Sequence, residues 1–382
     1  MSTNPSDARA HRTKPQLRPA RPYFSSGPCA KPPGWAADKL DTQVLGRSHR
    51  SGLGKARLKL AIDLMRETLR LPDSHRIGIV PGSDTGAFEM AMWTMLGARP
   101  VTACAWESFG EGWVTDAVKQ LALDPTVVRA DYGQLPDLAQ IEWSNDVLFT
   151  WNGTTSGVRV PDADWIPATR EGLSFADATS AVFAYDIDWD KVDVATFSWQ
   201  KALGGEGGHG VLILGPRAVE RLETYTPDRP LPKVFRLVSK GKLIEGIFSG
   251  ETINTPSMVA VEDAIFALEW AKSLGGLDGM IARTNANAAA LDRLVKGRDW
   301  LGHLAVNPAS RSRTSVCLTV DAPPERIKAI VKLLEAEGVA FDIASYRDAP
   351  PGLRIWCGAT VDSADIEALG PWLDWAFAET QS

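Results

Sequence analysis

Val194-Ala-Thr-Phe-Ser-Trp-Gln-Lys201 and Leu173-Ser-Phe-Ala-Asp177 are the two stretches that decide the fold. Each is an apolar run of strand length that leads to one ionisable side chain, Lys201 or Asp177. Continuously apolar strands are typical of a parallel sheet that is buried on both faces. Ligands of such sheets gather at the carboxyl ends of the strands. We therefore expect Lys201 and Asp177 to open into one crevice.

The pairing of a lysine with an aspartate at strand ends indicates a particular cofactor. Burying an ammonium group is costly unless it is paired or neutralised, and a Schiff base removes the charge. Pyridoxal phosphate (PLP) needs a lysine for its aldehyde and an anion beside its ring nitrogen. Taken singly, Lys201 could be an exposed turn residue, and Asp177 could be a helix N-cap. Together they favour a PLP site.

Helical and strand patterns alternate around these stretches, which predicts an α/β fold. Up to residue 275 we expect helices over 56–69, 86–96, 112–123 and 255–274, and strands over 77–80, 101–106, 147–150, 173–176, 194–198 and 211–214. After Gly275-Gly276 we expect helices over 278–296, 324–337 and 363–378, and strands over 315–320, 339–343 and 353–356. These patterns predict a flexible basic tail over 1–20, a large domain over 21–275 and a small α+β domain over 276–382.

Composition excludes several classes of protein. The 382 residues carry 41 basic and 47 acidic side chains, a net charge of −6. That balance argues against nucleic-acid binding as the main role. No run of about 18 apolar residues is present, so we expect no membrane span. Four scattered cysteines and five histidines without zinc spacing predict no metal site. The first residues lack the apolar core of a secretory signal, so we expect a cytoplasmic protein.

Two further segments could bind anions. Pro81-Gly-Ser-Asp-Thr-Gly-Ala-Phe88 links a strand to a helix, an arrangement that presents backbone N–H groups to a phosphate. Gly46-Arg-Ser-His-Arg-Ser51 places three potential cations in four positions. The plainer interpretations are an ordinary N-cap for the first segment and a solvated charge run for the second.

Two other motif matches fail on context. Gly205-Glu-Gly-Gly-His-Gly210 fits a dinucleotide-binding pattern, but a strand and not a helix follows it. Ser198-Trp-Gln-Lys201 fits the SxxK of penicillin-binding enzymes, but no KTG triplet exists.

The chain resembles the class V, fold-type I PLP aminotransferases and, within them, the phosphoserine aminotransferases. The resemblance spans about residues 22–380. It rests on Phe24-Ser-Ser-Gly-Pro28, Ser48-His-Arg50, Asp177-x-Thr-Ser180, Trp199-Gln-Lys201 and Asn254-Thr-Pro256. It implies a mainly parallel seven-stranded sheet covered by helices, and a smaller C-terminal α+β domain. The implied reaction exchanges an amino group between L-glutamate and 3-phosphohydroxypyruvate in serine biosynthesis; 4-phosphohydroxythreonine, a precursor in pyridoxine synthesis, is a further possible substrate.

The resemblance also implies roles at the cofactor. Lys201 would hold the aldehyde as a Schiff base and then move the proton between substrate and cofactor, while Asp177 would pair with the ring nitrogen. Trp113 would stack on the ring, with Phe109 as the second choice. Thr154 would bond near the ring hydroxyl. The family's phosphate positions correspond to Asp84, Thr85 and Gln200, and in a homodimer to Asn254 and Thr255 of the partner subunit.

The implied substrate contacts are mostly cationic, and the expected partners are small anionic molecules. Arg354 would hold the α-carboxylate. His49 and Arg50 would bind the second anionic group, Arg347 would contact the phosphate, and Ser26 would contact glutamate.

Some residues depart from the family pattern. Gly82-Ser-Asp-Thr-Gly86 lacks the usual phosphate-loop arginine, and Tyr346 occupies a position that is histidine in the more familiar members. Residues 229–249 are a basic insertion that either borders the site entrance or forms a solvated surface loop. Three alternatives remain open: an alanine–glyoxylate or serine–pyruvate aminotransferase, a cysteine desulfurase with a mobile cysteine, and a non-catalytic PLP-fold protein.

Overall fold

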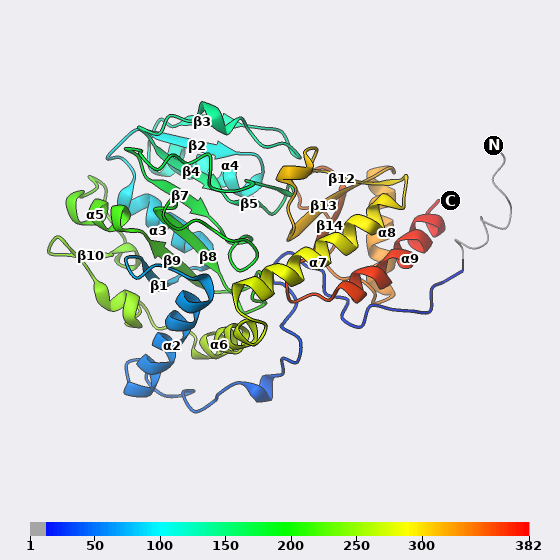
Figure 1. The fold of residues 1–382 in the computed structure, drawn as a ribbon, viewed down its shortest axis with the longest axis horizontal. Coiled ribbons are helices and arrows are strands. Elements are labelled where there is room, and N and C mark those ends of the chain that lie inside the picture. The colour runs from blue at the N-terminus through cyan, green and yellow to red at the C-terminus, as the bar shows by residue number, and fades with distance from the viewer. Residues whose placement is uncertain (1–12, 382) are drawn as a thin grey trace.

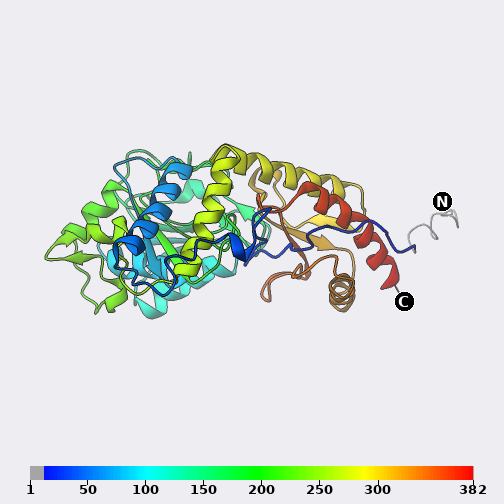
Figure 2. The ribbon, with the colours of Figure 1, turned by 90° about the horizontal axis from the view of Figure 1, so that it is seen from below.

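The computed structural model of the chain describes residues 13–381. Two units lie side by side along the long axis (Figures 1 and 2), and each has its own β-sheet. The larger sheet has seven strands in the order β1-β9-β8-β7-β4-β2-β3. Its strands are β1 Arg76–Pro81, β2 Val101–Ala105, β3 Thr126–Arg129, β4 Asp146–Thr150, β7 Ser174–Asp177, β8 Val194–Ser198 and β9 His209–Leu214.

The large sheet is mainly parallel, as the sequence predicts. Strand β9 runs antiparallel to both of its neighbours, β1 and β8, and the pairs from β8 through to β3 are parallel. Asp177 of β7 is in register with Thr150 of β4 and Thr196 of β8. The polar ends of three neighbouring strands therefore meet at one edge of the sheet.

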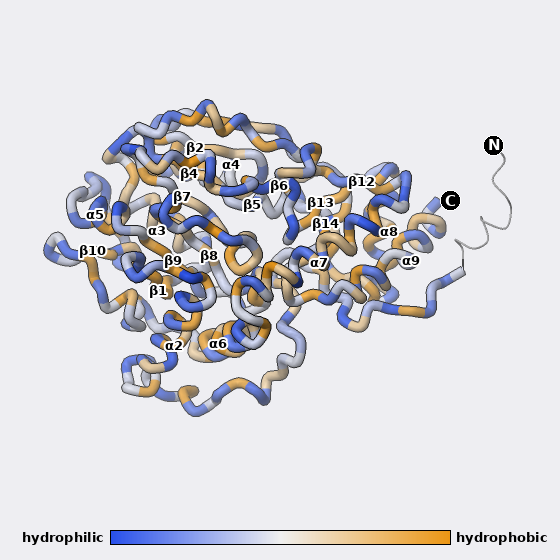
Figure 3. Tube along the Cα trace, viewed as in Figure 1, coloured by the Kyte–Doolittle hydropathy of each residue, from blue (hydrophilic) through white to orange (hydrophobic). Residues whose placement is uncertain are grey.

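Helices cover both faces of this sheet (Figure 1). Helices α2 Gly52–Leu69 and α6 Met258–Ser273 pack on one face. Helices α3 Ser83–Met95, α4 Ser108–Thr115 and α5 Pro216–Thr224 pack on the other. Residues of β2, β4, β7, β8 and β9 are buried throughout, because both faces of the sheet are covered. Hydrophobic and hydrophilic residues are mixed along α2, as expected for a helix with one face on the core (Figure 3).

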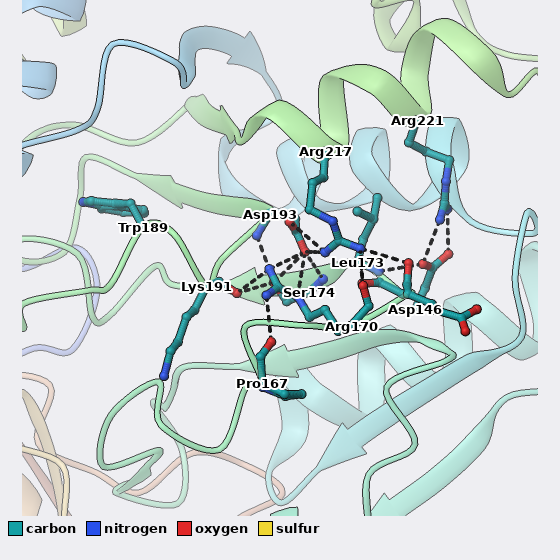
Figure 4. A network of polar contacts seen from close by, with 12 residues as sticks. Asp146, Pro167, Arg170, Leu173, Ser174, Trp189, Lys191, Asp193, Arg217 and Arg221 are labelled. Atoms are coloured by element: carbon teal, nitrogen blue, oxygen red, sulfur yellow. Dashed lines mark hydrogen bonds and ion pairs between the residues drawn. The ribbon is translucent and has the colours of Figure 1, made fainter.

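A polar network secures the sheet away from the strand ends that carry Lys201 and Asp177. Asp193 is 4% exposed and accepts from Arg170, Arg217 and the backbone N–H of Ser174 (Figure 4). Asp146 is fully buried and pairs with Arg221 of α5 at 2.7 Å (Figure 4). Each buried carboxylate is therefore neutralised by arginine, which offsets the cost of removing it from water.

The small unit is α+β. Its three-stranded antiparallel sheet has the order β12-β13-β14. Its elements are α7 Leu277–Lys296, β12 Leu301–His303, β13 Ser315–Val320, α8 Pro324–Ala336, β14 Gly352–Trp356 and α9 Ser363–Glu379. Short pieces complete the chain: the two-residue strands β5 Asn152–Gly153, β6 Val158–Arg159, β10 Val238–Ser239 and β11 Lys242–Leu243, and the helical turns η1 Ala37–Lys39, η2 Asp116–Gln120, η3 Leu138–Gln140, η4 Lys233–Phe235, η5 Glu245–Ser249 and η6 Pro308–Ser310.

The N-terminal segment differs in part from expectation. Residues 1–12 of the expected tail lie outside the described residues. Residues 14–20 are held on the small unit: Leu17 accepts from the indole N–H of Trp372, and the N–H of Ala20 donates to Asp365 at 2.7 Å. Arg18 stacks 4.8 Å from the Trp372 ring centre. Side-chain contacts of this kind leave no periodic signal in the sequence.

Three other local expectations need correction. The helix expected over 112–123 begins earlier, at Ser108, because the Glu107 side chain caps its N-terminus. It continues into the π-helical turn η2, which ends at Gln120. Residues 339–343 form only an isolated bridge, Tyr23 to Phe341, because no neighbouring strand pairs with them along their length. The basic segment 229–249 packs at the end of α3, where Arg229 donates to the carbonyl of Leu96, remote from the small unit (Figure 1).

Candidate active site

A cavity of about 350 Å3 opens where β4, β7 and β8 end, beside the start of α3. Of the residues that the sequence singles out, it brings together Asp84, Thr85, Phe109, Trp113, Thr154, Asp177, Gln200 and Lys201. The remaining lining residues are Gly27, Pro28, Ser83, Thr150, Asn152, Thr179, Gly207 and Gly208. Strand ends, a helix start and a glycine-rich loop therefore converge on one hollow.

Lys201 reaches the cavity from the turn after β8. Its Nζ donates to the carbonyl of Ser26 and forms no ion pair with any residue in 13–381. Burial lowers the pKa of Lys201, and the nearby Arg354 lowers it further, while Cys29 and Asp177 act in the opposite direction. A lowered pKa leaves more of the lysine as the neutral amine, which is the form that attacks a carbonyl carbon.

Gly27 makes room for that lysine. Its φ of +146° lies in a region that side chains rarely adopt, and a Cβ there would lie 2.7 Å from Nζ of Lys201. The glycine of Phe24-Ser-Ser-Gly-Pro28 is therefore required by the approach of the lysine chain.

Asp177 is fixed by donors from two directions. The indole N–H of Trp113 donates to its Oδ2 at 3.1 Å, and the backbone N–H of Thr179 donates to its Oδ1 at 3.1 Å. Trp113 in turn packs against Phe88 of α3, with ring centres 4.5 Å apart. A 5% exposed carboxylate held this way can accept one more hydrogen bond from a protonated ring nitrogen.

The start of α3 presents backbone donors to the same cavity. The N–H of Ser83 donates to the carbonyl of Gly208, and that of Gly86 donates to the carbonyl of Gly82. The N–H groups of Asp84 and Thr85 have no hydrogen-bond partner among the described residues. Gln200 lines the same cavity, and its Oε1 is buried without a partner in the described chain; as an acceptor, this oxygen suits a donor group and not the phosphate. This end of the cavity suits a phosphate, because free helix N–H groups bind anions.

The side chain of Asp84 turns away from that end. It faces Asp177, Thr179 and Thr196 and is 7% exposed. Burial raises the pKa of Asp84 well above its usual range, and the charge of Asp177 raises it further. The backbone N–H of Asp84 is therefore free at the end that suits a phosphate, whereas its carboxyl faces Asp177.

A hydroxyl network joins the two units at the cavity wall. Thr154 donates to Ser180 at 3.0 Å, and the carbonyl of Thr154 accepts from Ser315 of β13 at 2.6 Å. Ser315 also shares a 3.1 Å hydrogen bond with Ser26, which is buried. Ser26 and Thr154 are thus held by the small sheet, and the position of that sheet bears directly on the site.

Arg354 of β14 supplies a cation beside Lys201, whose pKa it influences. Its Nε is buried and has no partner among the described residues. The Tyr346 ring lies 5.7 Å from its guanidinium and 5.6 Å from the ring of Phe109. An unpaired guanidinium next to the reactive lysine suits a carboxylate.

Seven predicted residues are not part of the cavity lining. Ser26 and Arg354 lie directly beside it, next to Lys201, and the other five lie apart from it: His49, Arg50, Asn254, Thr255 and Arg347. Arg347 is 80% exposed, and its Nε lies 3.5 Å from Asp348. Arg50, Asn254 and Thr255 are also exposed. The segments 48–55 and 250–255 share a surface, since Lys55 pairs with Glu251 at 2.6 Å and Arg50 helps to lower the pKa of Glu251.

Glu107 is a site residue that sequence reasoning missed. It is 2% exposed, caps α4 through the N–H of Gly110 at 2.9 Å, and accepts from the hydroxyl of Thr155 at 2.7 Å. Burial raises the pKa of Glu107. Its sequence signal was the one that singled out Asp177: a carboxylate directly after a buried strand.

The four cysteines are buried free thiols. Burial raises the pKa of Cys29, Cys104 and Cys317 to about 12 and also raises that of Cys357. Cysteine desulfurases need a mobile, reactive thiol, so this arrangement does not support that alternative. Among residues 13–381 no cluster of His, Cys, Asp and Glu could hold a metal ion.

Comparison with known proteins decides the family. The chain is 58% identical over 365 residues to the phosphoserine aminotransferase of Methanosarcina barkeri, a match that covers 95% of this chain and 99% of that protein. The chain belongs to the phosphoserine aminotransferase family. No protein-family model matches it.

Solved structures agree with this family at the level of the fold. A phosphoserine aminotransferase from Cytophaga hutchinsonii superposes with a TM-score of 0.81 at 22% identity, covering 92% of this chain and 98% of that one. A PLP-bound phosphoserine aminotransferase from Trichomonas vaginalis superposes with a TM-score of 0.74 at 19% identity, covering 92% and 99%. The predicted resemblance and fold class are thereby confirmed. None of the helices described is long and apolar enough to span a membrane.

Proposed function

We propose that this chain is a PLP-dependent aminotransferase that exchanges the amino group between L-glutamate and 3-phosphohydroxypyruvate. The observation that carries the proposal is the convergence of Lys201, Asp177 and free helix N–H groups on one cavity. Together these three features match the aldehyde, the ring nitrogen and the phosphate of PLP. When bound, PLP supplies an electron sink that stabilises negative charge at the substrate's α-carbon.

The residues of this chain supply the rest. Lys201, with its lowered pKa, would be the base that accepts the proton from the substrate's α-carbon and the acid that later gives it up. Asp177 would keep the ring nitrogen protonated, and Trp113 would hold Asp177 in place. Arg354 would bind the α-carboxylate of each substrate in turn. Tyr346 and Phe109 would border the entrance and limit water access.

The second anionic group of the substrate needs cations that this chain's own cavity does not provide. His49 and Arg50 lie on the same surface as Asn254 and Thr255, outside the cavity lining. We propose that a second copy of the chain brings this surface to the cavity, so that the working enzyme is a homodimer. Without that copy, the cavity suits the alternative, an alanine–glyoxylate or serine–pyruvate aminotransferase.

Absorption spectroscopy tests the reaction. The purified protein, incubated with PLP, should gain a visible band that changes on addition of phosphoserine or glutamate but not alanine. Borohydride reduction followed by peptide mapping should leave the pyridoxyl group on Lys201. A response to alanine or serine alone would favour the alternative aminotransferases, and no band would overturn the cofactor assignment. Adding 4-phosphohydroxythreonine to the same assay tests the second substrate.

Subunit mixing tests the shared site. Lys201→Ala and Arg50→Ala should each be inactive with phosphoserine on its own. In mixed dimers, one site would combine the intact Lys201 of one chain with the intact Arg50 of the other, so part of the activity should return. If the mixture stays inactive while mixed dimers form, Arg50 serves its own chain's cavity or none.

A further inference from the structure

A second carboxyl group, that of Asp84, lies beside Asp177. It comes from the first turn of α3, whereas Asp177 ends β7. Its side chain also faces the hydroxyls of Thr179 and Thr196, and Thr196 is the register partner of Asp177 on β8. The start of α3 and the ends of β7 and β8 therefore place two carboxyls and two hydroxyls in one buried cluster.

No cation forms an ion pair with either carboxyl among the described residues, although Lys201 lies in the same cavity and interacts with Asp177 at longer range. In the part of the chain that the structure describes, no lysine, arginine or histidine forms an ion pair with Asp84. Oδ1 of Asp84 is buried without a hydrogen-bond donor, and the hydroxyls of Thr179 and Thr196 have no other partner among residues 13–381. Two adjacent carboxylates without a cation cannot both stay ionised, so one of them carries a proton.

The surrounding donors decide where that proton resides. Asp177 receives hydrogen bonds from Trp113 and from the backbone of Thr179, both of which stabilise its charged form. Asp84 has one oxygen, Oδ1, without a donor. Burial and then the charge of Asp177 raise its pKa, and the hydroxyls of Thr196 and Thr179 offset this only in part. Asp84 is therefore the neutral acid, and an acid O–H is a donor that Asp177 can accept.

We propose that Asp84 is a positioning residue of the cofactor site: its protonated carboxyl donates a hydrogen bond to Asp177 and fixes the orientation in which Asp177 meets the cofactor's ring nitrogen. The inference rests on the proposed function, since it assigns Asp84 a role toward PLP. Asp84 would thereby serve both ends of the cofactor: its carboxyl would act on Asp177 at the ring nitrogen, and its free backbone N–H would face the phosphate.

The first test uses the apoprotein and needs no cofactor. The folded-state pKa of Asp84 is raised, so the folded protein binds a proton more tightly than the unfolded chain, and wild-type stability is lost as pH rises above the ordinary aspartate range. Asp84→Asn removes this loss. The stability difference between variant and wild type should therefore shift in favour of the variant as pH rises, whereas the exposed control Asp124→Asn should show no such trend. A difference that stays flat with pH would overturn the proton on Asp84.

The second test uses the PLP-loaded protein. Asp84→Asn keeps a neutral donor and should bind PLP within about threefold of wild type, with the same pH dependence of the visible band. Asp84→Ala removes the donor to a charged partner and should weaken PLP binding by about tenfold or more. Equal losses in both variants, or none in Asp84→Ala, would overturn the proposal. A wild-type chain that takes up no PLP overturns the proposed function itself, and the apoprotein titration still decides whether Asp84 holds the proton.

Discussion

Replacing Gly27 with alanine should disable Lys201 while leaving the fold largely intact. The new Cβ would lie 2.7 Å from Nζ and 3.0 Å from Cε of Lys201. Carbon atoms in good contact lie at about 3.5–4.0 Å, so the end of the lysine chain must move by several tenths of an ångström. A flexible side-chain end can move that far at little cost in stability.

We expect Gly27→Ala to have two effects, a loss of stability and a loss of catalytic rate. A non-glycine residue at this positive φ costs about 1–3 kcal/mol of stability. Displacing a catalytic group by about 1 Å can cost about 100-fold in rate, and the shift here is somewhat smaller. We therefore expect kcat to fall by about 10- to 100-fold.

Gly34→Ala is the matched control. Gly34 also has a positive φ, +79°, but its Cβ would meet only Nζ of Lys39, at 3.9 Å. Both variants strain the backbone, and only one of them crowds Lys201. Thermal unfolding measures the first effect, and phosphoserine turnover together with PLP uptake measures the second.

The reasoning is refuted if Gly27→Ala takes up PLP and turns over as fast as Gly34→Ala. That result would show that the lysine does not depend on the space beside residue 27. Gly27→Ser places a Cβ at the same position beside Lys201, so we expect it to lose PLP uptake and turnover as Gly27→Ala does.

Three further outcomes are expected. Asp193→Ala should lower the free energy of unfolding by about 3–5 kcal/mol, because it leaves buried arginine unpaired; Asp164→Ala, which removes an 89% exposed carboxylate, should change it little in the same denaturant titration. Arg354→Ala should reduce kcat/KM for glutamate by about 10- to 100-fold, as expected for one hydrogen-bonded charge pair, and the loss should exceed that of Arg347→Ala. Burial raises the pKa of Glu107, so its ionisation opposes folding above the ordinary glutamate range; Glu107→Gln should make apoprotein stability depend less on pH, and an unchanged pH profile would contradict this.

The sheet and the central pair of the site could be predicted because their signals are local. An apolar run that ends on Lys201 or Asp177 reports both a buried strand and a polar strand end. The structure of residues 339–343 could not be predicted in the same way, because an apolar run becomes a strand only when a neighbouring strand pairs with it along its length. The isolated bridge at Phe341 is a single pair and forms no strand. The start of α4 depended on the side chain of Glu107, which the helical period does not encode.

The direction of a side chain is a further limit of sequence reasoning. The motif around Asp84 predicts a phosphate loop, and the free N–H groups of Asp84 and Thr85 agree with it. The same motif says nothing about the Asp84 carboxyl, which turns beneath the site toward Asp177 because α3 begins beside β8 and β9. Likewise, the family resemblance predicts a substrate contact for Arg50, and the structure adds that Arg50 shares a surface with the 250–255 segment and not with the cavity lining.

The charges of the cavity support the proposal that a second chain completes the site. Among the residues that line it, Lys201 is the only cation, and Asp84 and Asp177 are both carboxyls. With Asp84 neutral, Asp177 is the charged carboxyl of the lining, and Arg354, beside Lys201, is the cation that remains for the substrate. One guanidinium suits the carboxylate that all amino acids share, but it cannot distinguish phosphoserine from alanine. That distinction requires further cations, and the half-buried His49 and the exposed Arg50 are two candidates that lie outside the lining of this chain's own cavity. Under the proposed homodimer, substrate choice would be a property of the assembled subunits, whereas cofactor binding would be mainly a property of one chain.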